Sequence, residues 1–216
     1  MSEIKAIVSD FGGVLTSPLI GSFMRIQAAW DLPLESLGKA MQTVTERDGA
    51  NPLFELECGR LTEHEFLERL GHALREDLGR DVPMHEFSEE MWRALEPNHE
   101  VFELLSALRD DGYRMALLTN NVREWEHRWR GMFPIDELFE VVVDSAFVGM
   151  RKPDPRIYEL TVERIGLPAG ACLFIDDMEI NITAARDLGM RAVHFRDNAQ
   201  AIADIHAALG RAATPR

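Results

Sequence analysis

The fold is decided by one stretch near the N-terminus, Ile4-Lys-Ala-Ile-Val-Ser-Asp-Phe-Gly-Gly-Val-Leu-Thr16. A short apolar run with β-branched residues, Ala6-Ile-Val8, stops at Ser9-Asp10, and a flexible glycine pair follows. This order predicts a buried strand that ends in a carboxylate and is followed by a turn. Ligands of open α/β sheets bind just beyond the carboxyl ends of the strands. Asp10 is therefore the first candidate for chemistry, although this stretch alone fits equally well an aspartate that only caps the turn.

The composition is that of an ordinary globular protein. The chain has 216 residues, of which 46% are hydrophobic and 28% are charged, which is enough for one domain with a large insertion. Its formal net charge of −14 predicts that nucleic acid and anionic membranes are not partners, because an acidic surface repels both. A bound phosphate would need local positive charge from a lysine, a metal ion or a helix N-terminus.

Two features predict a cytoplasmic location. The N-terminal residues lack the long apolar segment of a signal peptide, and no apolar run is long enough to span a bilayer. Cys58 and Cys172 are too few for a disulfide framework. They are predicted to be small apolar residues in a reducing compartment, although a single bridge stays open.

Strand and helix patterns alternate in most of the chain. We expect strands at residues 4–9, 114–119, 139–143, 171–175 and 191–195, and helices at 101–111, 123–130, 155–165, 180–188 and 199–209. Such alternation requires a parallel sheet that is covered on both faces. The predicted fold class is therefore α/β, a doubly wound, Rossmann-like parallel sheet.

The region from about Ile20 to Leu95 has helical periodicity and no convincing strand. Thr62-Glu-His-Glu65 has the form of a capping box before an apolar helix. We therefore expect an all-helical insertion at residues 18–96, and an α/β core built from residues 1–17 and 97–216.

Polar groups gather where the predicted strands end. Asp176 and Asp177 would repel each other at a partly buried strand end, and a hard divalent cation such as Mg²⁺ would relieve that repulsion. Asp10 would reach the same cation if the two strands are parallel neighbours. The alternative, in which Asp177 caps the next helix, explains only one of the two carboxylates.

Three further side chains near the same sheet edge suit a phosphate ligand. Lys152 stands between Arg151 and Pro153, and its ammonium would screen negative charge on both a phosphate and Asp10, although an isolated lysine is more often solvated. Thr119 and Asn120 offer a hydroxyl and an amide to phosphoryl oxygens, and a satisfied turn is the alternative.

Four segments resemble, in order and spacing, the four motifs of the haloacid dehalogenase superfamily. They are Asp10-Phe-Gly-Gly-Val-Leu15, Leu118-Thr-Asn120, Arg151-Lys-Pro-Asp-Pro-Arg-Ile-Tyr158 and Phe174-Ile-Asp-Asp177. The likeness extends from about Ile4 to Phe195, and the helical insertion resembles the cap between the first and second motifs. It is strongest to small capped phosphatases, such as the bacterial glucose-1-phosphate phosphatases and the N-terminal phosphatase domain of soluble epoxide hydrolases.

The resemblance implies a role for each of these groups. Asp10 would be the nucleophile that forms an aspartyl phosphate, and Lys152 would neutralise charge beside it. The cofactor would be Mg²⁺, held by Asp10, the Gly12 carbonyl and Asp177, with Asp176 acting through water or as a support. The substrate, a small phosphorylated metabolite such as a sugar phosphate, would be bound by Phe11, Gly12, Thr119 and Asn120.

Gly12 departs from the common pattern of the superfamily. Typical phosphatases of the superfamily carry at this position a second aspartate, which serves as general acid and base. Glycine keeps the backbone ligand but not the proton shuttle, whose loss typically reduces the rate about a hundred- to ten-thousand-fold. The glucose-1-phosphate phosphatases resemble this chain in carrying glycine there, so Gly12 does not exclude catalysis.

Three functions stay open, and a Mg²⁺-dependent phosphatase is favoured. A 2-haloacid dehalogenase, in which Asp10 attacks carbon without a metal, also lacks the second aspartate but leaves Asp176 and Asp177 as unneeded repulsion. A phospho-ligand-binding protein that has lost its proton shuttle is the third. The oligomeric state is not predicted.

Several aromatic and sulfur-containing side chains are predicted to be ordinary core residues. Trp125 and Trp129, one helical turn apart, are expected to pack and not to form a substrate platform. Met24 and Met41 could line a pocket in the helical insertion, but filling its core is the commoner use of methionine.

Overall fold

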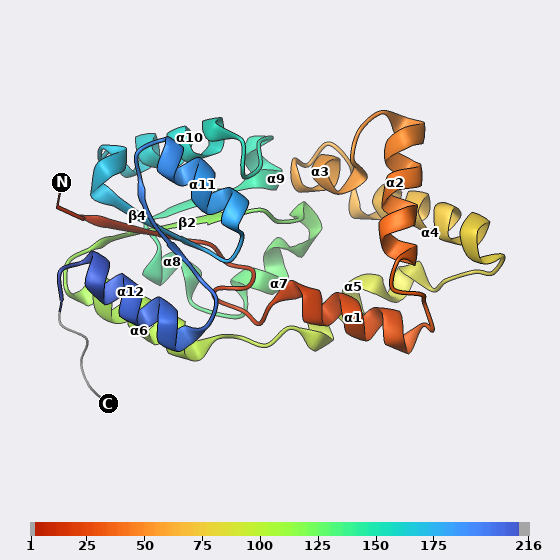
Figure 1. The fold of residues 1–216 in the computed structure, drawn as a ribbon, viewed down its shortest axis with the longest axis horizontal. Helices are drawn as coiled ribbons and strands as arrows, with labels where there is room; N and C mark the ends of the chain where they lie inside the picture. The colour runs from red at the N-terminus through yellow and green to blue at the C-terminus, as the bar shows by residue number, and fades with distance from the viewer. Residues whose placement is uncertain (1–2, 212–216) are drawn as a thin grey trace.

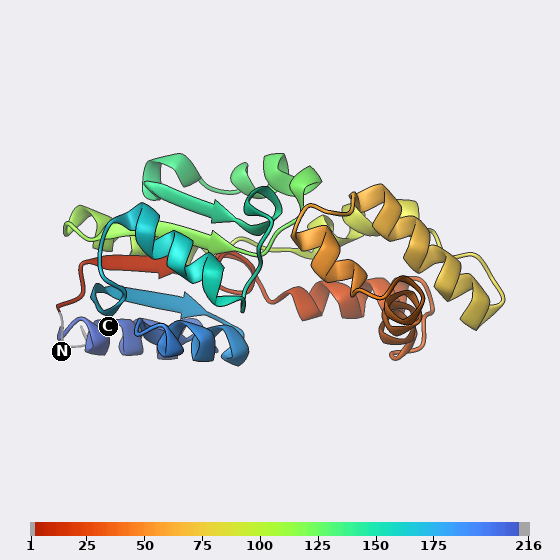
Figure 2. The ribbon, with the colours of Figure 1, turned by 90° about the horizontal axis from the view of Figure 1, so that it is seen from above.

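A computed structural model describes residues 3–211 of the chain. Figure 1 shows a helix-covered sheet next to a separate group of helices, which lies beyond one end of the strands. From above, the strand arrows in Figure 2 point toward the separate helices, so the carboxyl ends of the strands face them.

The sheet has five parallel strands in the order β3-β2-β1-β4-β5. The strands are β1 (Ala6–Ser9), β2 (Arg114–Thr119), β3 (Val141–Asp144), β4 (Cys172–Asp176) and β5 (Arg191–His194). Each overlaps its predicted range, and the predicted α/β fold is confirmed. The chain runs outward from β1 to β3 and then returns to add β4 on the other side of β1, so the strand order reverses beside β1. The carboxyl end of β1 is thus the topological switch point, where ligands of such sheets bind.

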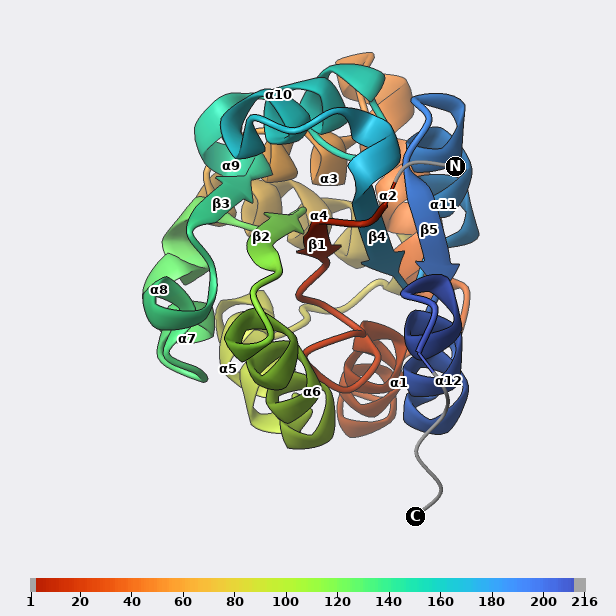
Figure 3. The ribbon, with the colours of Figure 1, turned by 90° about the vertical axis from the view of Figure 1, so that its left-hand side faces the viewer.

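Successive residues of the strands face opposite layers of helices, as a pleated strand requires. In β1, Ile7 belongs to one hydrophobic cluster and Ala6 and Val8 belong to the other. Figure 3 shows α10 and α11 on one face and α6 and α12 on the other. The helices of this part are α6 (His99–Asp110), α7 (Glu126–Arg130), α8 (Ile135–Leu138), α9 (Ser145–Val148), α10 (Pro155–Ile165), α11 (Glu179–Asp187) and α12 (Asn198–Ala208), with 3-10 turns η2 (Arg123–Trp125) and η3 (Ala169–Ala171).

The separate helices have a hydrophobic core of their own, which includes Leu56, Leu70 and Leu74. We call this group of helices the cap. Its elements are α1 (Leu19–Ala29), α2 (Ser36–Asp48), α3 (Pro52–Glu57), α4 (Glu63–Leu78), η1 (Met84–Glu86) and α5 (Phe87–Ala94). The capping box predicted at the start of α4 is present, because Thr62 and Glu65 each accept a backbone hydrogen bond from the other.

The chain enters and leaves the cap at adjacent points. The backbone N–H of Ser17 donates to the Glu96 carbonyl at 2.8 Å, and that of Asn98 donates to the Leu15 carbonyl at 2.8 Å. We propose that the cap and the α/β core are distinct units with boundaries at residues 17–18 and 96–97, which fall at this double crossing.

Two predictions about the rest of the chain concern cysteines and membranes. Cys58 and Cys172 are free and buried, as expected for small apolar residues. Among the helices within residues 3–211, none is long and apolar enough to cross a membrane.

Candidate active site

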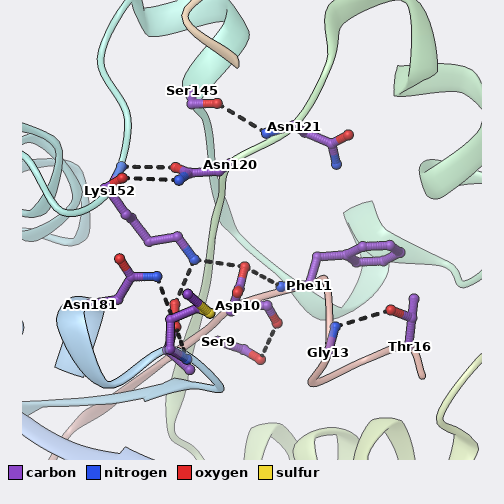
Figure 4. Close-up of polar contacts among 12 residues, drawn as sticks. Ser9, Asp10, Phe11, Gly13, Thr16, Asn120, Asn121, Ser145, Lys152 and Asn181 are labelled. Atoms are coloured by element: carbon purple, nitrogen blue, oxygen red, sulfur yellow. Dashed lines mark hydrogen bonds and ion pairs between the residues drawn. The ribbon is translucent and has the colours of Figure 1, made fainter. Parts of the chain in front are cut away.

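The carboxyl ends of the two central strands bring the predicted carboxylates together. Strands β1 and β4 pair in parallel, with Ser9 opposite Ile175, so Asp10 and Asp176 leave the sheet side by side. Ligand oxygens of Asp10, Asp176 and Asp177 all lie within 4.8 Å of one another. The cluster expected from the sequence therefore exists at the switch point, and Figure 4 shows the polar contacts around Asp10.

Lys152 completes this cluster with a buried positive charge. Its Nζ atom lies 2.7 Å from Asp10 Oδ1 and 2.6 Å from Asp176 Oδ2, and the side chain is only 1% exposed. The alternative of a solvated surface lysine is therefore wrong. Figure 4 shows Lys152 extending from its loop toward Asp10.

The side chain of Asn120 positions the lysine segment. Its Nδ2 atom donates to the Lys152 carbonyl at 3.0 Å, and its Oδ1 atom accepts from the Lys152 N–H at 2.8 Å. The sequence predicted that this amide donates to phosphoryl oxygens, whereas the structure directs it to the backbone next to the ammonium. Direct contact between Asn120 and the substrate stays a prediction.

Asp10 presents one of its two oxygens to a ligand. Oδ1 accepts a 2.7 Å hydrogen bond from the Phe11 N–H and contacts the Lys152 ammonium. Among the described residues, no hydrogen bond to Oδ2 is found. This second oxygen is thus the one that is free to approach phosphorus or a cation.

In Asp176, by contrast, both carboxylate oxygens have protein partners. Oδ1 accepts from the Met178 N–H at 2.8 Å and from Asn181 Nδ2 at 2.9 Å, and Oδ2 contacts Lys152. The side chain is fully buried. These contacts fit a support for the lysine, which is one of the two roles that the sequence left open, and an action on the cation through water stays a prediction.

Asp177 is half-buried and lies against the glycine turn after β1. A Cβ atom added to Gly13 would lie only 2.2 Å from Asp177 Oδ2, and Gly13 has a φ of +75° that favours glycine. The Asp177 carbonyl also contacts the Nε2 atom of His194 on β5 at 2.9 Å. Sequence reasoning did not single out His194, because its contact with Asp177 depends on the order of the strands in the sheet.

The charges at the site do not balance. Burial raises the pKa of Asp10 well above its usual value; Lys152 opposes this shift, and Asp176 and Asp177 add to it. Burial and then Asp176 raise the pKa of Asp177. Burial lowers the pKa of Lys152, but Asp10 and Asp176 outweigh it and the pKa is higher than usual. Three carboxylates against one ammonium, with oxygen ligands close together, fit a hard divalent cation such as Mg²⁺.

The position that lacks the second aspartate is occupied by a cap side chain. A Cβ atom added to Gly12 would lie 3.3 Å from Leu19 Cδ1 in α1. The space into which a carboxyl group would project is therefore apolar. Both atoms near such a Cβ belong to Leu19, so an apolar side chain, and not a polar one, lies where the missing acid and base would project.

A cavity of about 180 Å³ lies between this sheet edge and the cap. All four residues predicted to bind substrate line it, namely Phe11, Gly12, Thr119 and Asn120. The cap contributes residues from α1 to α5. The cavity therefore connects the candidate phosphate site with the interior of the cap.

Some residues that line this cavity were assigned to packing from the sequence. Trp125 and Met41 pack against the hydrophobic core of the cap, as predicted, and both also line the cavity. Trp129 is fully buried and its ring lies 5.4 Å from that of Phe11, as predicted for a packing residue. Met24, which was also expected in the core, is 56% exposed on α1.

Glu57 is a further lining residue that sequence reasoning did not single out. It ends α3 and accepts a 2.5 Å hydrogen bond from Arg151 Nε. Burial raises its pKa, and Arg151 opposes the shift. Because Arg151 precedes Lys152, this ion pair joins the cap to the segment that carries the catalytic candidate.

Known proteins resemble the chain over nearly all of its length. It is 25% identical to rat bifunctional epoxide hydrolase 2 over 96% of this chain, but spans only 39% of that relative. It is 26% identical to the sesquiterpene phosphatase astK of Aspergillus oryzae, over 97% of this chain and 98% of that protein.

A solved structure is similar as well. The HAD family enzyme BT-2542 of Bacteroides thetaiotaomicron, in complex with magnesium and inorganic phosphate, has a TM-score of 0.64 and 26% identity, covering 89% of this chain and 94% of that one. The sequence pattern of haloacid dehalogenase-like hydrolases matches residues 4–189, which include every residue of the cluster around Lys152. This chain belongs to the haloacid dehalogenase-like hydrolase family.

Proposed function

We propose that this chain is a Mg²⁺-dependent phosphatase of a small phosphorylated metabolite and that it acts through an aspartyl phosphate on Asp10. One observation carries the proposal. A buried carboxylate with one unpaired oxygen lies beside a buried ammonium and two further carboxylates, all within reach of one cation. Phosphoryl transfer requires this neutralisation of charge together with in-line positioning.

The reaction balances in two steps. A carboxylate oxygen of Asp10 attacks phosphorus, the P–O bond to the organic group breaks, and the electron pair leaves on the organic oxygen. Water then attacks the same phosphorus, which restores the carboxylate and releases inorganic phosphate. The net reaction consumes one water, whose protons are shared between the released alcohol and phosphate.

The remaining residues hold and neutralise charge. Asp10, Asp177 and the Gly12 carbonyl would bind Mg²⁺, which would stabilise negative charge on the transferred phosphoryl group. Lys152, fixed by Asp176 and Asn120, would neutralise charge beside the nucleophile. Because an apolar side chain faces Gly12, the organic group must leave without a proton from that position, so acidic leaving groups should react fastest.

The dehalogenase and the non-catalytic binding protein are less well supported. A metal-independent attack on carbon would leave the negative charge of Asp177 uncompensated beside Asp10, and the chain's relatives include proteins named as phosphatases. A cytoplasmic location and the absence of nucleic-acid and membrane partners stay predictions from the sequence.

The test is hydrolysis of p-nitrophenyl phosphate, whose leaving group needs no protonation. We expect turnover by the wild type with Mg²⁺, little with EDTA, and at least about a thousandfold less with Asp10→Asn, since a nucleophile has no substitute. Asp111→Asn, at an exposed residue paired with Arg211, is the matched control and should behave as the wild type.

Each alternative function predicts a different experimental result. Equal turnover by the wild type and Asp10→Asn would refute the nucleophile. Chloride release from 2-chloropropionate without Mg²⁺ would support the dehalogenase. Binding of inorganic phosphate without hydrolysis of any phosphate ester would support the binding protein.

A further inference from the structure

The walls of the cavity beside Phe11 and Gly12 are mostly apolar where the cap forms them, and Glu57 is the charged exception. The apolar cap residues in its lining are Leu19, Phe23, Leu37, Met41, Leu53, Leu56, Phe66, Leu70, Phe87 and Met91. They come from helices on all sides of the cavity, so an apolar surface surrounds whatever extends from the sheet edge into the cap.

The polar groups of the same lining are mostly occupied by protein partners. The amide of Asn120 pairs with Lys152, and Asn121 Oδ1 accepts from the Val122 N–H at 2.9 Å. Glu57 is bound to Arg151, and Trp125 Nε1 donates to Glu63 Oε1 at 2.7 Å. These contacts leave few hydrogen-bonding groups for the hydroxyls of a sugar.

Some polar atoms of this lining have no hydrogen-bond partner among the described residues. Trp92 Nε1 is buried without one, and Thr119 Oγ1 and Asn121 Nδ2 accept or donate no side-chain hydrogen bond there. Thr119 and Asn121 lie at the sheet edge, so the cap side of the cavity offers few groups to the several hydroxyls that a bound sugar removes from water.

We propose that the substrate is the phosphate monoester of a hydrophobic alcohol or phenol, with its phosphate at Asp10 and its hydrocarbon portion in the cavity under the cap. This inference rests on the proposed phosphatase function and replaces the sugar phosphate expected from the sequence. The driving force is the transfer of hydrocarbon from water into an apolar cavity. Specificity then comes from the cap, and the sheet edge supplies the chemistry.

The cavity limits the size of the hydrocarbon. An apolar cavity of roughly 150 Å³ is enough to bind benzene, and this one measures about 180 Å³. It therefore holds a ring with a short extension, or a chain of about seven carbons on the same scale. Leu19 lines the cavity and is also 39% exposed, so the cavity reaches the surface beside α1.

The experiment uses a series of aryl phosphates with nearly constant leaving-group acidity: phenyl, 4-methylphenyl, 4-ethylphenyl and 4-propylphenyl phosphate. Wild-type kcat/KM should rise by about fourfold for each methylene that is buried, mainly through KM. The rise should stop once the cavity is full. Glucose 1-phosphate and glucose 6-phosphate serve as polar comparators and should be poorer substrates than 4-propylphenyl phosphate.

A matched pair of methionine variants locates the hydrocarbon. Met41→Gln places a polar group of similar size in the cavity wall and should remove most of the gain between the phenyl and 4-propylphenyl esters. Met24→Gln changes a methionine that is 56% exposed and should preserve the whole gain. The wild-type series tests the proposal even if Met41→Gln folds poorly.

The outcomes separate this inference from the function on which it rests. Turnover of p-nitrophenyl phosphate with a flat alkyl series, or with faster turnover of the sugar phosphates, would overturn the hydrophobic substrate and leave the phosphatase intact. No turnover of any phosphate ester would overturn the phosphatase itself. An undiminished gain in correctly folded Met41→Gln would contradict the placement of the hydrocarbon under the cap.

Discussion

The Lys152 ammonium lies 2.6 Å from Asp176 Oδ2, and neither side chain is more than 1% exposed. The other oxygen of Asp176 accepts hydrogen bonds from the Met178 N–H and from Asn181 Nδ2. This buried pair therefore fixes the lysine beside Asp10. Such an arrangement resists bending of the long lysine side chain, which would otherwise be flexible.

Replacing Lys152 with an uncharged residue should destabilise the folded protein. Lys152→Met leaves buried carboxylates without their counter-charge, and breaking a buried pair in this way typically costs about 3–5 kcal/mol. We expect a loss of that size in urea unfolding without Mg²⁺. Lys39→Met, at an exposed lysine 3.8 Å from Asp77, should change stability by less than about 1 kcal/mol. A Lys152→Met protein as stable as the control would contradict the buried pair.

Gly13 and Gly49 give a matched test of the metal site. Both have a φ of +75°, but a Cβ atom on Gly13 would meet Asp177 Oδ2 at 2.2 Å, whereas none of the surrounding atoms lies within 4 Å of one on Gly49. Alanine at either position should be destabilising by about 1 kcal/mol because of the backbone conformation. Only Gly13→Ala should also displace the Asp177 carboxylate.

The readout that separates these two effects is the response to Mg²⁺. A ligand that binds only the folded state raises the melting temperature. We expect this rise in the wild type and in Gly49→Ala, and its loss in Gly13→Ala. If Gly13→Ala responded to Mg²⁺ as strongly as Gly49→Ala does, Asp177 would not be a ligand.

The sequence predicts the carboxylate cluster because its signals are local. An apolar run marks a buried strand, and parallel strands place their carboxyl ends at one edge. Asp10 and the pair Asp176-Asp177 could be assigned to that edge without knowledge of the tertiary contacts. Short helices such as α8 and α9, of four residues each, have too few residues to show a helical period.

The contacts that connect distant segments were not predictable in the same way. Asn120 pairs with Lys152 across 32 residues, and Leu19 faces Gly12 from the cap. Periodicity tells which face of a helix is apolar, but it does not tell whether that face packs against a neighbour or borders a cavity. The sequence therefore does not show that Met41 and Trp125, which pack against the cap core, also border the cavity.

The ion pair between Glu57 and Arg151 predicts a link between cap position and substrate affinity. Glu57→Gln keeps the shape of the side chain but removes the charge that holds α3 to the segment before Lys152. A cap that opens more easily should raise KM several-fold for p-nitrophenyl phosphate and change kcat by less than about threefold. Glu55→Gln, at the neighbouring pair with Arg60, is the control and should change KM less.

The size of the kcat effect also decides whether Glu57 takes part in the chemistry. A loss of kcat of a hundredfold or more, of the size typical of a general acid or base, would mean that Glu57 moves a proton. The ion pair would then be more than a mechanical link between cap and core.

Asp144, at the end of β3, predicts a pH dependence of stability that is independent of the active site. Its Oδ1 atom accepts from the Ala146 N–H at 2.9 Å, whereas Oδ2 is buried and has no hydrogen-bond partner within residues 3–211. Burial raises its pKa to about 6; Glu126 adds to this shift, and Arg130 and Arg123 oppose it. The folded protein therefore binds a proton that the unfolded chain has already released.

The sign of the effect follows from this difference in proton binding. A carboxyl group whose pKa is raised by folding stabilises the protein most below its unfolded pKa, and this contribution is lost as the pH rises through its folded pKa. With a folded pKa of about 6, Asp144 should reduce the free energy of unfolding by about 1.4 kcal/mol between pH 5 and pH 7.5. Asp144→Asn keeps an acceptor for Ala146 and carries no charge, so it should lack this loss.

The measurement is urea unfolding of the wild type and Asp144→Asn at both pH values. The difference between the two proteins isolates Asp144, because every other titrating group is common to both. We expect the variant to gain about 1.4 kcal/mol relative to the wild type when the pH is raised. Asp136→Asn, at a carboxylate that is 82% exposed and paired with Arg130, should show almost no pH-dependent gain. A constant difference between Asp144→Asn and the wild type would mean that Asp144 is already ionised at pH 5, and that its unpartnered oxygen is in contact with water.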